Sequence, residues 1–144
     1  MNSVPTPPIR PGRADDVLGV LELWRRAEGS RSSTESAEDV GGLLLRDPEA
    51  LLLAETDGGE IVGSLIVGWN GWRGSFYRMA VDPSHRRRGL ATALVRAGEE
   101  RLHALGARRL DAIVETHEPG AMAFWASAGY ELQTSRSRFV KNLP

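Results

Sequence analysis

Residues 79–92 read MAVDPSHRRRGLAT, and this stretch decides which fold the sequence predicts. Residues 79–81 are apolar and typical of the end of a β-strand, which Asp82 and Pro83 then terminate because proline cannot donate to a strand ladder. Three arginines follow, and a helical pattern begins at Gly89. The stretch therefore predicts a strand, a tight basic turn and a helix in direct succession.

The basic turn and the start of the following helix indicate an anion-binding site. The first turn of a helix has backbone N–H groups without intrahelical acceptors, and it carries the positive end of the helix dipole. Gly89 lets the backbone approach a phosphate, and the small side chain of Ala91 keeps that approach open. The guanidinium groups of Arg86, Arg87 and Arg88 would attract a multiply charged ligand. Alone the pattern is weak, because consecutive arginines are more often solvated surface.

Two common nucleotide-binding motifs do not fit this turn. No Lys-Ser or Lys-Thr pair closes it, as a P-loop requires. The three glycines of the dinucleotide fingerprint are also absent. The turn therefore resembles neither a P-loop nor a dinucleotide-binding turn.

The pattern of apolar and turn residues on both sides predicts the order β-α-α-β-β-β-α-β-α-β. Strands are expected near residues 9–10, 50–55, 61–69, 75–81, 109–114 and within 130–140, and helices near 17–24, 40–44, 90–105 and 121–128. Residues 57–59 and 70–71 predict hairpin turns, and Gly106 is expected to end the long helix in the left-handed conformation. This order predicts an α/β fold with a mixed, mostly antiparallel sheet and helices on both faces.

Composition limits the classes of partner and site. The 144 residues suit one domain, expected over 1–144 with the proline-rich residues 1–8 loosely held. The net charge of −1 gives no bulk attraction to nucleic acid or an anionic membrane. With no cysteine and three scattered histidines, no metal is expected. No apolar stretch, residues 50–54 included, is long enough to span a bilayer, so we expect a cytoplasmic protein.

Residues 86–91 resemble the (Gln/Arg)-x-x-Gly-x-(Gly/Ala) motif of the GNAT acetyltransferases, in that family's usual strand-turn-helix setting. Residues 79–83 look like the family's fourth strand and its exit, and residues 121–130 are similar to its penultimate helix running into Gly-aromatic. Residues 9–24 fit the family's opening, and residues 68–74 are similar to a turn of small bacterial members. The resemblance covers about residues 9–140.

The resemblance implies the GNAT acyl-CoA N-acyltransferase fold, with acetyl-CoA as cosubstrate and direct transfer of its acetyl group to a primary amine. It implies that the pyrophosphate sits on the backbone amides of Arg87, Arg88, Gly89, Leu90, Ala91 and Thr92, with Arg86 either reaching a phosphate or staying solvated. The pantetheine arm is expected to add to the open strand edge along Met79, Ala80 and Val81. The Met79 amide would then donate to the thioester carbonyl.

The sequence departs from the family pattern at the positions that would move protons. Trp125 stands where the family often has a tyrosine that protonates the thiolate, and it is expected to contact the cofactor. Glu118 replaces a common asparagine, and Ser75 stands where some relatives carry a glutamate that acts as the general base. Tyr77 and Glu115 are therefore the candidate catalytic residues, with a structural hydroxyl and a surface charge as their respective alternatives.

The first helix end and the following loop, residues 24–36, normally line the acceptor side in this family. Trp24 is expected in the core, whereas Glu28, Glu35 and Glu38 are either acceptor-attracting or solvated charges. Either Trp69 or Trp72 is expected to be exposed, toward the acceptor or a second subunit. The acceptor itself is not identified, and a homodimer is left open.

Two alternatives to the acetyltransferase hypothesis remain at this point. One is a catalytically degenerate GNAT domain that senses acetyl-CoA or acts as an interaction module, because the usual tyrosine and asparagine are missing. The other is an RNA-binding domain that uses Arg86, Arg87 and Arg88 with Trp72 nearby. The acidic balance of the chain and the lack of further aromatic-basic interleaving count against RNA.

Overall fold

The computed structural model describes residues 6–27 and 34–144, and these form two compact units that divide between Ile113 and Val114. The two units are taken separately. The elements of the first unit are β1 (Ile9–Pro11), α1 (Val17–Arg26), α2 (Ala37–Arg46), β2 (Leu51–Glu55), β3 (Ile61–Trp69), β4 (Gly74–Val81), α3 (Leu90–Leu105) and β5 (Leu110–Ala112), with short 3-10 turns η1 (Ala14–Asp16), η2 (Pro48–Ala50) and η3 (Pro83–His85). The second unit contains α4 (Pro119–Ser127).

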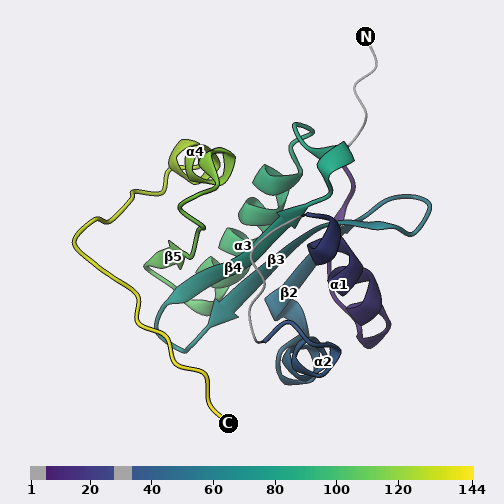
Figure 1. Cartoon of the computed structure of the whole chain (residues 1–144), viewed down its shortest axis with the longest axis horizontal. Helices are drawn as coiled ribbons and strands as arrows, with labels where there is room; N and C mark the ends of the chain where they lie inside the picture. The colour runs from purple at the N-terminus through teal and green to yellow at the C-terminus, as the bar shows by residue number, and fades with distance from the viewer. Residues whose placement is uncertain (1–5, 28–33) are drawn as a thin grey trace. The chain divides into compact units, whose positions relative to one another are not determined.

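The strands of the first unit form one sheet in the order β1-β2-β3-β4-β5 (Figure 1). The first three pairs of neighbours are antiparallel, and β4 pairs with β5 in parallel. Both predicted hairpin turns form, with Gly59 and Gly71 at φ angles of 87° and 88°. The side-chain oxygen of Asn70 accepts the backbone N–H of Trp72 and that of Arg73, at 2.8 and 2.7 Å. The predicted mixed, mostly antiparallel sheet is therefore confirmed.

Helices cover both faces of this sheet, α1 and α2 on one and α3 on the other (Figure 1). Successive side chains of a strand point to opposite faces. In β2, Leu53 therefore packs in the cluster that contains Val20 and Leu23 of α1, whereas Ala54 packs with Leu90 of α3. The apolar spacing predicted for the first and third helices thus marks their buried faces.

Helix α3 lies close against the sheet because Gly98 has no side chain. A Cβ atom there would lie 2.6 Å from Cε1 of Phe76, which is closer than such atoms can approach, and in a tight contact of 3.1 Å with Cγ2 of Val67. The predicted stripe on α3 is buried at Leu90, Leu94, Gly98 and Leu102. Leu105, which was predicted to continue the stripe, is 44% exposed at the helix end.

The second unit departs from the prediction after its helix. Helix α4 is followed by Gly129 at a φ of 95°, as the Gly-aromatic pattern predicted. The strand or strands expected within residues 130–140 do not form, and residues 131–144 are exposed without regular structure. Residues 133–138 carry no apolar side chain, so a strand there would have no face to bury.

Candidate functional site

Strand β4 leads directly into a turn that Asp82 stabilises. A side-chain oxygen of Asp82 accepts the backbone N–H of Ser84 at 3.1 Å, and its carbonyl accepts the N–H of His85 at 2.8 Å. Pro83 stands at the first position of η3, where its missing N–H costs nothing. The Asp-Pro pair therefore both ends the strand, as predicted, and caps the turn.

Two residues of the turn adopt the left-handed conformation, Arg87 at a φ of 64° and Gly89 at 79°. This conformation is unfavourable for arginine and free for glycine. The backbone N–H groups of residues 87–92 form no hydrogen bond with any other described residue, and no side chain caps α3. The three arginine side chains are exposed. The turn thus presents unpaired N–H donors, a helix dipole and positive charge at one place.

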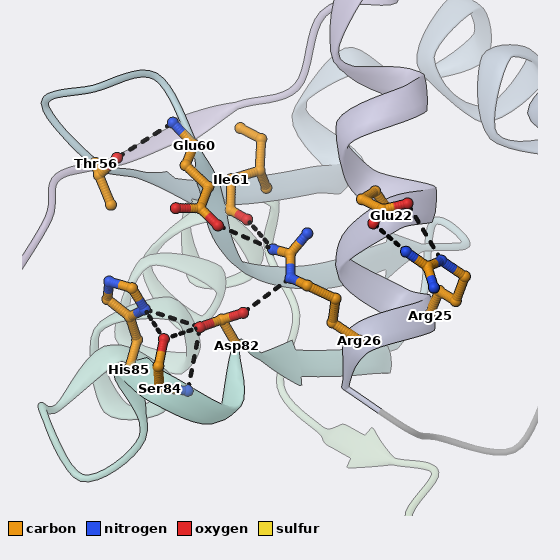
Figure 2. Close-up of polar contacts among 9 residues, drawn as sticks. All are labelled: Glu22, Arg25, Arg26, Thr56, Glu60, Ile61, Asp82, Ser84 and His85. Atoms are coloured by element: carbon orange, nitrogen blue, oxygen red, sulfur yellow. Dashed lines mark hydrogen bonds and ion pairs between the residues drawn. The ribbon is translucent and has the colours of Figure 1, made fainter.

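Asp82 also anchors the turn to helix α1 (Figure 2). Its buried carboxylate lies 2.9 Å from Nε of Arg26 and 2.9 Å from Nδ1 of His85, and the Ser84 hydroxyl donates to it. The hydrogen bond from Ser84, followed by that from His85, holds the pKa of Asp82 well below its usual value. An ionised carboxylate only accepts hydrogen bonds, so the proton of the His85 ring lies on Nδ1.

Arg26 is therefore the link between the last turn of α1 and the basic turn. Its second contact is with β3, because Nη2 donates to the carbonyl oxygen of Ile61 at 3.1 Å. A third, weaker contact is the ion pair between Nη2 of Arg26 and Oε1 of Glu60, which lie 3.6 Å apart (Figure 2). Sequence reasoning did not single out Arg26, because its partner Asp82 lies far along the chain.

The outer edge of β4 is paired along only part of its length. The parallel ladder with β5 joins Gly74, Ser75 and Phe76 to residues 110–112, and the N–H of Ile113 donates to the Phe76 carbonyl at 3.2 Å. Beyond Phe76, no residue of β5 pairs with β4. The predicted pantetheine contacts, Met79, Ala80 and Val81, all lie in this later part of the strand.

Strand β4 carries a bulge at Arg78 and Met79. Ser64 is paired with Ala80 and Ile66 with Tyr77, so two residues of β4 oppose a single residue of β3. Arg78 occupies the bulge at a φ of 52°. The Ser64 hydroxyl donates to the Arg78 carbonyl at 3.3 Å and accepts from Nε1 of Trp24 at 2.9 Å. The direction of the strand at Met79 is therefore set by a bulge that buried polar groups hold.

The structure places the other sequence candidates as follows. Tyr77 is 40% exposed and lies two residues before Met79, so its phenol is accessible. In the second unit, Trp125 makes edge-to-face ring contacts with Phe124 and Tyr130, at centroid distances of 5.4 and 5.0 Å. Glu115 is exposed, and its carboxylate lies 3.6 Å from the ring of His117. Within that unit, Glu115 is thus a surface carboxylate next to an imidazole ring.

The expected acceptor-side residues divide into core and surface. Trp24 is buried, as predicted, and Glu38 is exposed. Glu28 lies outside the described residues. Glu35 is not a solvated loop charge, because it is only 14% exposed and pairs with Arg78 at 2.6 Å.

Of the two turn tryptophans, Trp72 is 67% exposed and Arg73 lies over its ring. The RNA-binding alternative required Trp72 to lie near the arginine turn. Trp72 instead precedes the first residue of β4, and the turn follows the last. A strand of 8 residues is about 26 Å long, so the two do not form one patch.

Two further features concern residues 6–27 and 34–144. No group of three metal-ligating His, Asp or Glu side chains occurs there. Within the same ranges, no helix combines the length and the apolar composition that crossing a membrane requires.

Residues 17–130 match the sequence model of the acetyltransferase (GNAT) family. The chain belongs to the GNAT family. It is 35% identical over 127 residues to an acetyltransferase of Sodalis glossinidius, a match that covers 88% of this chain and 89% of that protein. This GNAT protein is therefore an acyltransferase, as the resemblance of residues 86–91 implied.

Solved structures agree with the GNAT fold. Ard1 from Thermoplasma volcanium has a TM-score of 0.78 at 19% identity, covering 88% of this chain and 84% of that chain. The PaiA N-acetyltransferase from Thermoplasma acidophilum, solved in complex with coenzyme A, has a TM-score of 0.78 at 15% identity and covers 88% and 90%. At these identities the two structures establish the fold, and the GNAT fold prediction is confirmed.

Proposed function

We propose that this GNAT protein transfers the acetyl group of acetyl-CoA to a primary amine. The observation that carries the proposal is the turn after β4, where the N–H groups of residues 87–92 have no described acceptor. At Gly89, whose φ is 79°, the one atom of the described residues beyond its chain neighbours within 4 Å of where a Cβ would stand is the Thr6 hydroxyl oxygen, at 3.7 Å. A diphosphate fits such a turn, because the N–H groups, the helix dipole and the exposed arginines all favour negative charge. The coenzyme A complex of the similar PaiA protein supports the same ligand class.

The edge of β4 beyond Phe76 suits the arm that connects the diphosphate to the thioester. An extended chain can add to a free strand edge through backbone hydrogen bonds. We assign this role to the backbone of Met79, Ala80 and Val81, which β5 leaves unpaired. Their side chains can pack in the strand at the same time, because the assigned contacts use only backbone atoms.

When bound, acetyl-CoA supplies a thioester whose carbonyl carbon bonds to the neutral amine nitrogen as the C–S bond breaks, so the amine loses one proton and the thiolate gains one. The Met79 N–H would donate to the carbonyl oxygen as negative charge develops there. Tyr77, with its accessible phenol, is the proposed donor to the thiolate. Glu115 is the proposed acceptor of the amine proton, and Trp125 a proposed cofactor contact.

The test measures thermal unfolding of the full chain with and without acetyl-CoA, followed by release of coenzyme A thiol with a panel of amines. At about 100 times its dissociation constant, the ligand should stabilise the fold by about 2.7 kcal/mol. For a chain of this size, that corresponds to a rise in Tm of roughly 5–10 °C. No rise in a cooperatively melting protein would refute the proposal. A rise without thiol release from any amine would favour the degenerate sensor instead.

The assignment of Tyr77 has a separate test in the same assay. Removing a general acid typically lowers the rate 10²- to 10⁴-fold. Tyr77→Phe should therefore reduce kcat by about 100-fold while the acetyl-CoA-induced rise in Tm persists. The matched control is Ser75→Ala, because Ser75 lies two residues before Tyr77 on the same face of the strand. Equal kcat values for Tyr77→Phe and the parent would return Tyr77 to a structural role.

A further inference from the structure

Arg78 and Glu35 form an ion pair of two mostly buried side chains. Nε of Arg78 lies 2.6 Å from Oε1 of Glu35, and the side chains are 16% and 14% exposed. The Arg78 guanidinium also lies over the ring of Trp24, 4.9 Å from its centroid. Long charged side chains are seldom buried to this extent without a specific partner.

The hydrogen-bond donors of Arg78 exceed what these contacts use. A guanidinium offers five N–H donors in a fixed plane. Nε is buried and forms no aligned hydrogen bond despite the close ion pair, and neither Nη atom donates to any described residue. Burying unpaired N–H donors costs free energy. Arg78 therefore presents spare donors next to a single negative charge.

The position of this pair connects it with the reaction. Arg78 is the first residue of the bulge and Met79 the second, and the Arg78 side chain lies over Trp24 of α1. The proposed role of the Met79 N–H places the thioester carbonyl at that residue. An attacking amine must come within about 3–3.5 Å of the carbonyl carbon. A charged group on a carbon next to that amine would then lie within one side-chain length of Arg78.

We propose that Arg78 binds a carboxylate of the acceptor, and that Glu35 holds the acceptor's ammonium group before it loses its proton. The substrate class is therefore an α-amino acid or a similar amine that bears a carboxylate nearby. Arginine suits this role because its planar donors match the two carboxylate oxygens. The inference rests on the acetyl-transfer reaction proposed above, and it names the acceptor of that reaction.

The experiment compares each of a set of L-amino acids with its amide, for example alanine with alaninamide, in the thiol-release assay. The two members of a pair share the amine and differ in the carboxylate. We expect at least one acid to exceed its amide by about tenfold or more in kcat/KM, through a lower KM. A pair of peptide probes, aspartyl-alaninamide and asparaginyl-alaninamide, distinguishes a side-chain carboxylate at a peptide N-terminus from a free α-carboxylate.

Variants of the pair assign the preference to Arg78. In Arg78→Gln, kcat/KM for the preferred acid should fall at least about tenfold more than for its amide, while acetyl-CoA still raises Tm. Arg78→Lys keeps the positive charge but not the planar guanidinium, and it is the variant to use if Arg78→Gln fails to fold. It should lose part of the preference for the acid over the amide. Arg25→Gln, which removes an exposed arginine of α1 paired with Glu22, is the control and should retain the preference.

Several results would overturn the inference. These are equal or faster turnover of every amide, turnover only of amines without an anionic group, and an acid preference that survives in both Arg78 variants. Absence of turnover for all probes would also overturn it if acetyl-CoA still raises Tm. Failure of the proposed function is distinct, because it would appear as no acetyl-CoA-induced rise in Tm for the parent protein.

Discussion

Helix α3 has a left-handed glycine at each end, Gly89 at a φ of 79° and Gly106 at 101°, but the two ends are completed differently. At the C-terminal end, the Gly106 N–H donates to the His103 carbonyl at 3.0 Å and the Ala107 N–H to the Leu102 carbonyl at 2.9 Å. These bonds satisfy carbonyls that the last helical turn leaves free. At the N-terminal end, the N–H groups of residues 87–92 have no described acceptor.

The difference shows that one backbone conformation serves two purposes. At Gly106 it allows the chain to bond back onto the helix, which stabilises the helix end. At Gly89 it turns N–H groups outward without giving them a partner in the protein, so this end needs support from elsewhere. That support comes from Asp82, and from the Thr6 hydroxyl, which donates to the Arg88 carbonyl at 3.2 Å. An end that is held from outside yet left unpaired is suited to a ligand.

The largest expected effect concerns the support of the N-terminal end. Asp82→Ala removes the buried partner of Arg26, Ser84 and His85, so the free energy of unfolding should fall by about 2–4 kcal/mol. Urea unfolding measures it. His103→Ala, in the last turn at the C-terminal end, is the control and should cost less than about 0.5 kcal/mol. Similar losses in both variants would show that the two ends are supported alike.

Low pH should weaken the support of the same N-terminal end of α3. The pKa of Asp82 is lowered in the folded state, so its contribution is complete above the unfolded-state pKa of about 4 and is lost as the pH falls below it. Between about pH 5 and pH 2, the parent should therefore lose more unfolding free energy than Asp82→Ala does. Parallel stability curves for the two proteins would contradict this account of Asp82.

The next effect separates ligand binding from backbone strain. Gly89→Trp and Gly106→Trp each force a left-handed conformation on a residue with a Cβ, costing about 1–2 kcal/mol of folding stability. Only Gly89→Trp should lose the stabilisation of about 2.7 kcal/mol that acetyl-CoA gives at 100 times its dissociation constant. Thermal unfolding of both variants with and without acetyl-CoA checks this. A ligand response kept in both would place the cofactor away from the turn.

The smallest effect concerns the strained residue Arg87, two positions before Gly89. Arg87 has a φ of 64°, and asparagine tolerates that conformation better than arginine. Arg87→Asn should raise the free energy of unfolding by about 0.5 kcal/mol. Acetyl-CoA should still raise Tm, because the backbone N–H remains. Arg88→Asn, at a residue without a positive φ, is the control for loss of charge and should bring no gain in urea unfolding.

Much of the fold and the position of the turn could be predicted from the sequence because their causes are local. Strand alternation, the two hairpin turns and the Gly106 helix end each depend on residues close together in the chain. The strands expected within residues 130–140 were wrong because strand formation also depends on a partner and on a face to bury. Local β-forming residues such as Phe139 and Val140 do not supply either.

The bulge in β4 could not be predicted either, because it depends on contacts between distant parts of the chain. Regular alternation would put Phe76 and Ala80 on the same face of the sheet. In the structure, Phe76 lies against α3 at Gly98, whereas Ala80 packs in the core cluster with α1. The reversal comes from the extra residue at Arg78, and its ion pair with Glu35 joins distant parts of the chain. Nothing near Arg78 in the sequence signals either feature.

The strand order β1-β2-β3-β4-β5 has a consequence for how the protein is made. Each strand lies beside the one synthesised before it, and β2, β3 and β4 can pair stepwise through two hairpin turns as the chain emerges. Two long connections interrupt this order: α1 and α2 separate β1 from β2, and the crossover through α3 must form before β5 can join in parallel. The pairing of β5 with Gly74, Ser75 and Phe76 is thus the last feature of the sheet to appear, and a ribosome-bound fragment ending before β5 would hold the turn after β4 without it.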